Sequence, residues 1–308
     1  MMMETATNSA VIVTLDELLE LKKNSKMFCL SKLKAKNHLV GEQQTRLLAR
    51  GMEFAESRRY YAGDDVRNID WKVTARTGKA HTKLFTAERT RKVIVSIDMR
   101  SGMYFATNGV FKTVQAALIA ANIGWHAALK GDQVGGLIFD ENAFTEIRPR
   151  LGKKGLLPIL HELENQSGQH HKKCVSDELK EAVLDKAIEK VKRMATEASL
   201  CFIISDFRHL SCYAKNLLVQ IALSTKLYLI LVYDALEANF PKNGSYPISD
   251  GNQQIRLDGY DQKFLEAYQR LFMDRKNSLS ALCCQTKAHF MECSTEEDAL
   301  TFLKNEFR

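Results

Sequence analysis

The sequence has no apolar run long enough to cross a bilayer. Its strongest runs, Leu200 to Ile204 and Leu227 to Val232, are far shorter than the roughly 20 residues that a membrane helix needs. The first 21 residues contain no Lys or Arg and no long apolar stretch, so they do not resemble a secretory signal. We therefore expect a cytoplasmic protein without a membrane span, in which the apolar runs are buried strands.

Proline, paired cysteines and nucleotide-binding loops are also scarce or missing. Four prolines and no low-complexity tract argue against disorder and long linkers. The seven cysteines include no Cys-x-x-Cys pair, so we expect reduced thiols. The sequence contains no Walker loop, no Gly-x-Gly-x-x-Gly and no Gly-x-Ser-x-Gly. These absences disfavour nucleotide binding and a nucleophile-elbow hydrolase.

The net excess of positive charge lies mainly in one part of the chain. Residues 22–91 hold seventeen Lys and Arg against seven acidic residues, within an overall net charge of +7. Such a segment could attract nucleic acid, anionic lipid or an acidic protein, or it could be a solvated basic face. Nucleic-acid binding is disfavoured because no recognised motif interleaves the basic residues with exposed aromatics.

From residue 91 onward, strand and helix patterns alternate. Lys92 to Asp98 and Leu200 to Ser205 are apolar, strand-like runs, and between Phe111 and Leu129 apolar residues recur every three or four positions. This alternation predicts an α/β fold, a mainly parallel sheet with helices on both faces. Before residue 91 glycines punctuate short segments, so we expect residues 1–90 to form a separate small element of strands and turns and residues 91–308 the α/β domain.

Two of the predicted strands end in a carboxylate. Asp98 ends the first strand, and Asp206 follows Ser205 at the end of another. In open α/β sheets ligands bind at the carboxyl ends of strands, where the strand order reverses. If the two strands are neighbours, the acids converge and could hold Mg²⁺. By spacing alone we favour the alternative that each acid caps the helix that follows it.

The stretch from Gly51 to Glu88 resembles the signature of the domain of unknown function 58 family. The resemblance extends over roughly residues 41–235, with further matches at Lys112, Gly131 to Gly135 and Ile204 to Phe207. The residues that match the signature itself are Gly51, Glu53, Phe54, Arg58, Tyr60, Gly63, Asp64, Asp65, Arg67, Ile69, Asp70, Trp71, Ala75 and Arg76.

The resemblance implies a von Willebrand factor A-like domain and a MoxR-type AAA+ ATPase as partner. A complete metal-ion-dependent adhesion site in that fold reads Asp-x-Ser-x-Ser. Here the stretch is Asp98-Met99-Arg100-Ser101-Gly102, so Arg100 and Gly102 replace both serine ligands. Only Asp98 and Asp206 carry over, and we expect a degenerate site without metal, with Mg²⁺ binding disfavoured. We expect the Arg100 guanidinium to bridge the two carboxylates instead.

The charged residues of the signature allow two readings. They could form an acidic catalytic cluster, or an internal salt-bridge and hydrogen-bond network that fixes an irregular loop, in which Trp71 packs as the apolar anchor. We favour the structural or interface reading. A zinc site at His161, His170, His171 and Cys174 has suitable ligand types but lacks a spaced fourth ligand, and we disfavour it.

These observations favour a non-catalytic, chaperone-like interaction module that works with a MoxR-type ATPase in the assembly or maturation of another complex. No catalytic or cofactor-binding residue is assigned. Two alternatives stay open: a metal-dependent hydrolase that uses the crevice between Asp98 and Asp206, and nucleic-acid binding through residues 22–91.

Overall fold

The chain divides into two units, one made of residues 1–34 and 91–308 and the other of residues 35–90. The computed structural model describes residues 10–30, 52–61, 63–87, 90–168, 177–241, 244–249 and 254–307. This division differs from the predicted element over residues 1–90, because the N-terminal segment belongs to the larger unit.

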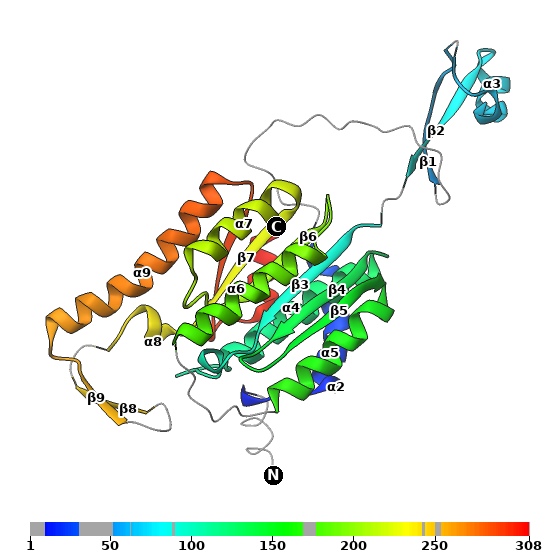
Figure 1. Ribbon diagram of the computed structural model, residues 1–308. Helices are drawn as coiled ribbons and strands as arrows, with labels where there is room; N and C mark the ends of the chain where they lie inside the picture. Colours follow the sequence, from blue (N-terminus) through cyan, green and yellow to red (C-terminus); the bar gives the residue numbers. More distant parts are fainter. Residues whose placement is uncertain are drawn as a thin grey trace. The chain divides into compact units, whose positions relative to one another are not determined.

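The larger unit is built on one six-stranded sheet with the order β10-β7-β6-β3-β4-β5 (Figure 1). All neighbouring strands are parallel except β4 and β5. The predicted mixed α/β architecture with a mainly parallel sheet is therefore confirmed. The strands are β3 (Lys92–Asp98), β4 (Gln133–Phe139), β5 (Phe144–Leu151), β6 (Leu200–Ser205), β7 (Lys226–Tyr233) and β10 (His289–Ser294).

Helices cover both faces of this sheet, and two apolar cores result. Side chains alternate along β3, so that Val95 and Ile97 enter one core while Ile94 enters the other. The first core is closed by α4 (Lys112–Leu129), α5 (Lys153–Ser167) and α10 (Ala299–Glu306). The second is closed by α6 (Asp177–Met194), α7 (Cys212–Ser224) and α9 (Gln262–Gln285).

The N-terminal segment packs on the first core. Thr14 and Glu17 form a capping box that starts α2 (Leu15–Glu20), and η1 (Leu21–Lys26) follows it. Leu18 is fully buried, and its carbonyl accepts a 2.8 Å hydrogen bond from the indole nitrogen of Trp125. This burial explains why the segment belongs with the α/β unit.

Shorter elements lie at the strand ends. They are η3 (Ser101–Met103) after β3, α8 (Ala235–Ala238) after β7, and a hairpin of β8 (Ser245–Ser249) and β9 (Gln254–Asp258) before α9. Within the described part of the chain, no helix is long and apolar enough to cross a membrane.

The smaller unit is an antiparallel pair, β1 (Met52–Arg59) and β2 (His81–Ala87). The connection between them contains η2 (Val66–Asn68) and α3 (Trp71–Thr77). Asp70 caps α3 by accepting a hydrogen bond from the Val73 amide at 3.2 Å. Gly78, at φ 68°, ends the helix in the left-handed conformation that glycine tolerates best.

Candidate functional site

Asp98 and Asp206 meet at the carboxyl edge of the sheet. Their strands β3 and β6 are parallel neighbours, with Ile97 paired to Ile204. Numbered along the chain, the six strands run 3-2-1-4-5-6 across the sheet, and the order reverses between β3 and β6. This is the position where open α/β sheets bind ligands. Both acids are almost completely buried.

Arg100 lies between these two carboxylates, as the sequence predicted. Its Nε is 2.9 Å and 3.1 Å from the two carboxylate oxygens of Asp98, and its Nη2 is 2.6 Å from Oδ2 of the same residue. The same Nη2 forms a longer ion pair with Asp206, 3.6 Å from Oδ1. Arg100 is 3% exposed, so its charge is held inside the protein. This pairing is the fork-shaped contact that a guanidinium makes with a carboxylate.

The remaining donors of Arg100 bind main-chain carbonyls. Nη1 donates to the carbonyl of Lys180 at 3.0 Å and to that of Arg208 at 3.4 Å. Burial opposes the charge of the guanidinium, but the carboxylates of Asp98, Asp206 and Glu141 together outweigh it and raise the pKa of Arg100. Arg100 therefore stays charged at physiological pH, and it links β3, α6 and the loop after β6.

Lys112 completes the cluster, and sequence analysis did not assign it to the site. Its ammonium nitrogen is fully buried, 3.1 Å from Oδ2 of Asp206 and 2.6 Å from Oε1 of Glu237. Lys112 is the first residue of α4, where the helix dipole disfavours a cation. A lysine at that position of an otherwise apolar helix is a signal that acidic partners lie nearby.

Two further arginines line the outer side of the cluster. Arg208 Nη2 lies 3.0 Å from Glu237 Oε1, and Arg275 Nη1 donates to the carbonyl of Asp206 at 3.0 Å. Burial alone would raise the pKa of Asp206, but Lys112 and Arg100 hold that pKa well below its ordinary value. Asp206 is therefore ionised throughout the physiological range and is not poised to transfer a proton.

The arrangement does not fit the divalent cation that a von Willebrand factor A-like site would hold. The space beside the carboxylates is taken by the Arg100 and Lys112 cations. The Ser101 hydroxyl donates to Glu141 Oε1 at 2.6 Å, away from both acids of the cluster. Gly102 has no hydroxyl to offer, although a β-carbon there would lie 3.4 Å from Asp206 Oδ2.

Other candidate ligands lie elsewhere. Across the part of the chain that the structure describes, no group of three or more His, Cys, Asp or Glu side chains is placed to hold a metal. His161 lies in α5, whereas His170, His171 and Cys174 of the proposed zinc cluster lie outside the described residues.

The family signature forms the smaller unit, and some of its charges pair as expected. Arg58 Nη2 is 2.7 Å from Asp64 Oδ1, and the buried Asp70 accepts a 2.6 Å hydrogen bond from Ser57. That hydroxyl and the capping amides lower the pKa of Asp70. Asp65 caps η2 through the amide of Arg67. These contacts are local caps and one ion pair.

Trp71 does not anchor this network. It is 70% exposed, because it is the first residue of a short helix whose capping residue, Asp70, takes the buried position instead. Val66 and Tyr61 are 61% and 65% exposed. The prediction that Trp71 packs inside is therefore wrong. Glu53 and Phe54 lie in β1, but their side chains fall outside the described part. Tyr60 and Gly63 lie in the connection after β1, and Arg76 lies in α3.

Comparison with known proteins gives relatives of modest similarity. The chain is 29% identical over 205 residues to the uncharacterized protein Mb1516 of Mycobacterium bovis and equally to the uncharacterized protein Rv1480 of Mycobacterium tuberculosis. These matches cover 67% of this chain and 62% of each relative. The chain thus matches less than two thirds of the relatives' length.

Two solved structures show low similarity to the chain. One is an aerotolerance-related membrane protein from Bacteroides fragilis, at 13% identity and a TM-score of 0.41, covering 70% of this chain and 98% of that one. The other is the conserved hypothetical protein BatB from Bacteroides thetaiotaomicron, at 15% identity and a TM-score of 0.43, covering 70% and 96%.

A family model settles the classification. It matches residues 56–278, which is well over half of the chain and includes the signature from Arg58 onward and the ion-pair cluster. The chain therefore belongs to the DUF58 family, whose model is described as a protein of unknown function.

Proposed function

We propose that this protein is a non-catalytic interaction module of the cytoplasm. In this proposal it acts with a MoxR-type AAA+ ATPase in the assembly or maturation of another protein complex. The observation that carries it is the exposure of the signature's large apolar side chains. Trp71, Val66 and Tyr61 are all more than 60% exposed. Tryptophan and tyrosine are the residue types that most often dominate binding energy when a partner covers them.

The ion-pair cluster supports a binding role over catalysis. A general acid or base works best when its pKa lies near the working pH. The neighbouring cations and carboxylates instead move the pKa of Asp206 down and that of Arg100 up, both away from neutrality. A metal-dependent hydrolase would also need room for the cation, which Arg100 and Lys112 occupy. The choice of a MoxR-type ATPase as partner rests on the family resemblance.

The test is native co-purification from the source cell, with ATP, with a non-hydrolysable analogue and without nucleotide. We expect a MoxR-type ATPase to be recovered with the wild-type protein and to be reduced with Trp71→Ala. The matched control is Leu223→Ala, an 80% exposed apolar residue on α7 of the larger unit, which should leave recovery unchanged. Consistent absence of any ATPase, or recovery of nucleic acid alone at physiological salt, would reject the proposal.

A further inference from the structure

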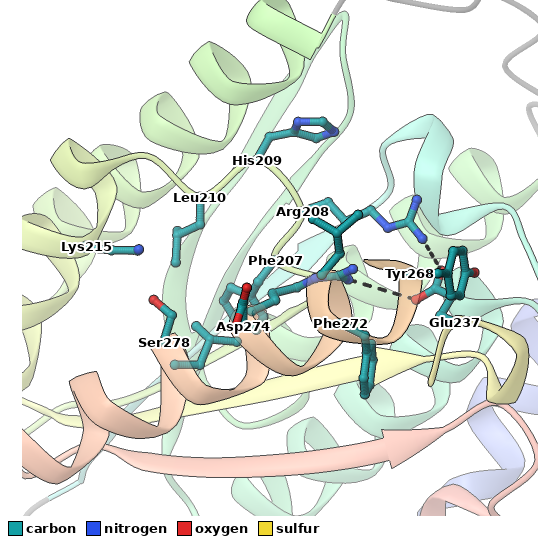
Figure 2. Close-up of a pocket in the computed structure, with 13 residues that line it drawn as sticks. Phe207, Arg208, His209, Leu210, Lys215, Glu237, Tyr268, Phe272, Asp274 and Ser278 are labelled. Carbon is teal, nitrogen blue, oxygen red and sulfur yellow. Dashed lines mark ion pairs between the residues drawn. The ribbon is translucent and has the colours of Figure 1, made fainter. Parts of the chain in front are cut away.

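A groove opens beside the ion-pair cluster, between the loop that follows β6 and helix α9. Its volume is about 580 Å³. Phe207 to Leu210 form one wall, Tyr268 and Phe272 of α9 form the other, and Glu237 lies beside Tyr268 (Figure 2). Arg275 of α9 also lines the groove. The groove lies next to Asp206, at the sheet edge where ligands bind in folds of this topology.

The charges of this groove are arranged by depth. The carboxylates are at the bottom, since the side chains of Asp206 and Glu237 are 2% and 3% exposed. The arginine side chains lie over the carboxylates and nearer the surface, with those of Arg208 and Arg275 41% and 18% exposed. Their guanidinium groups contact Glu237 and the Asp206 carbonyl. Two further charges line the groove, the half-buried Lys215 and the exposed Asp274, and they offset each other. A ligand that enters the groove therefore meets positive charge first.

Arg208 is held in place before any ligand arrives. Its amide donates to Asp206 Oδ1 at 3.0 Å, and its carbonyl accepts from Arg100 Nη1. The residues on either side, Phe207 and His209, have φ values of 49° and 61°. Non-glycine residues rarely adopt this left-handed conformation unless the surrounding structure imposes it. The cluster thus fixes the backbone of Arg208, so less freedom is lost when a partner binds to it.

Apolar surface and an unused acceptor adjoin the arginines. Leu271, on α9, is 69% exposed at the rim. At the bottom, Oε2 of Glu237 is buried and has no hydrogen-bond donor among the described residues, and Arg275 Nη1 is 4.0 Å away. Buried acceptors normally have a donor, so this oxygen indicates a place for a bound donor group. The groove thus combines outward cations, an apolar rim and a free acceptor.

We propose that this groove binds an acidic side chain of a protein partner, flanked by an apolar residue, through Arg208 and Arg275 and without a divalent cation. A carboxylate of the partner fits the outward guanidinium groups, and its apolar neighbour covers Leu271. A peptide offers these groups together with main-chain N–H donors, which an inorganic anion lacks. The proposal rests on the proposed function only in taking the partner to be a protein.

The experiment uses the full chain and an array of acetylated nine-residue peptides. In each peptide a central Glu, Asp, Gln or Lys is flanked by Leu or by Ser, and binding is measured with EDTA present. We expect Glu and Asp peptides with Leu flanks to bind about tenfold more tightly than their Gln counterparts, as loss of a charge-assisted hydrogen bond implies. Arg208→Gln should abolish that preference, and Arg208→Lys should retain part of it.

The matched control is Arg193→Gln, because Arg193 is an exposed arginine in the last turn of α6, which leads to the opposite edge of the sheet. It should bind like the wild type. Any of four results would overturn the proposal. Peptide affinity could be the same for the acid and the amide, binding could require Mg²⁺, Arg208→Gln could leave the preference for acid unchanged, or millimolar phosphate could displace the peptide. ATPase co-purification that persists in Arg208→Gln would leave the proposed function standing even if the peptides fail.

Discussion

Nη2 of Arg100 lies 2.6 Å from Oδ2 of Asp98 and 3.6 Å from Oδ1 of Asp206. Arg100 thus bridges the two converging carboxylates, and together with Lys112 on Asp206 it supplies the positive charge that they require. Because it is covalently attached, this charge cannot dissociate as a metal ion does. We therefore expect the state of the site not to depend on the supply of metal.

The first prediction concerns metal binding. The wild-type protein should bind neither Mg²⁺ nor Mn²⁺ in calorimetry. Arg100→Ser with Gly102→Ser removes the guanidinium and adds two hydroxyls, and a β-carbon at position 102 fits at an ordinary 3.4 Å contact with Asp206 Oδ2. We expect this double variant to bind Mg²⁺ weakly and to melt at a higher temperature when Mg²⁺ is added. Gly102→Ser alone should bind none. Millimolar or tighter binding by the wild type would contradict the prediction.

The second prediction concerns Lys112, whose ammonium is fully buried between Asp206 and Glu237. Lys112→Met should destabilise the protein by roughly 3–5 kcal/mol, because it leaves two buried carboxylates short of a cation. Glu237→Gln in the same chain should cost less than it does alone, since it then removes a carboxylate that has already lost its Lys112 partner. Denaturant unfolding measures both effects. Lys130→Ala, at an exposed residue after α4, is the control, and equal losses at the two lysines would refute the argument.

Much of this architecture could be predicted from the sequence. The β-branched run that ends at Asp98 and the run that ends at Ser205 are strands because both of their faces are buried, and such runs are readable from composition. The partnership of Arg100 with the two acids could be predicted because Arg100 follows Asp98 by two residues. Composition was sufficient for the strands, whereas spacing alone favoured helix caps at the two acids, and the bridge was predicted from the family resemblance.

Two features depended on contacts that spacing does not reveal. Glu237 is 125 residues from Lys112 in the sequence, so only the fold brings their charges together. Trp71 was misjudged because a tryptophan beside several charged residues usually packs against them, whereas here Asp70 takes the buried capping position. Composition did not show whether Trp71 or Asp70 would be the buried residue.

The third prediction separates the two residues at the start of α3. Trp71→Ala should change the free energy of unfolding by no more than about 0.5 kcal/mol, as is usual at exposed positions. Asp70→Ala should lower the free energy of unfolding by roughly 0.5–2 kcal/mol, the usual range for a lost helix cap, because it removes the acceptor of the Val73 amide. The same change also removes the acceptor of the Ser57 hydroxyl. Hydrogen exchange in β1 and β2 reports on the smaller unit directly. A large loss from Trp71→Ala would show that the tryptophan is structural after all.

The fourth prediction concerns the attachment of the N-terminal segment. His126 in α4 is buried, and its Nδ1 donates to the carbonyl of Ser25 at 2.7 Å while its ring stacks on Phe28 with centroids 5.0 Å apart. Burial lowers the pKa of His126, and the Ser25 carbonyl opposes that shift only in part. The unfolded chain, with an ordinary histidine pKa of about 6.5, therefore binds the proton more readily than the folded protein does.

It follows that stability conferred by neutral His126 is complete above about pH 6.5 and declines as the pH falls below that value. We expect hydrogen exchange at the Leu18 amide, which bonds to the Thr14 carbonyl, to accelerate between about pH 6.5 and pH 5 beyond the change in intrinsic rate. His126→Gln keeps a donor but cannot titrate, so its protection should not vary in that range. Burial also lowers the pKa of His289, and His289→Gln therefore serves as the matched control. If the pH dependence at Leu18 persists in His126→Gln and disappears in His289→Gln, the segment is released through the other histidine.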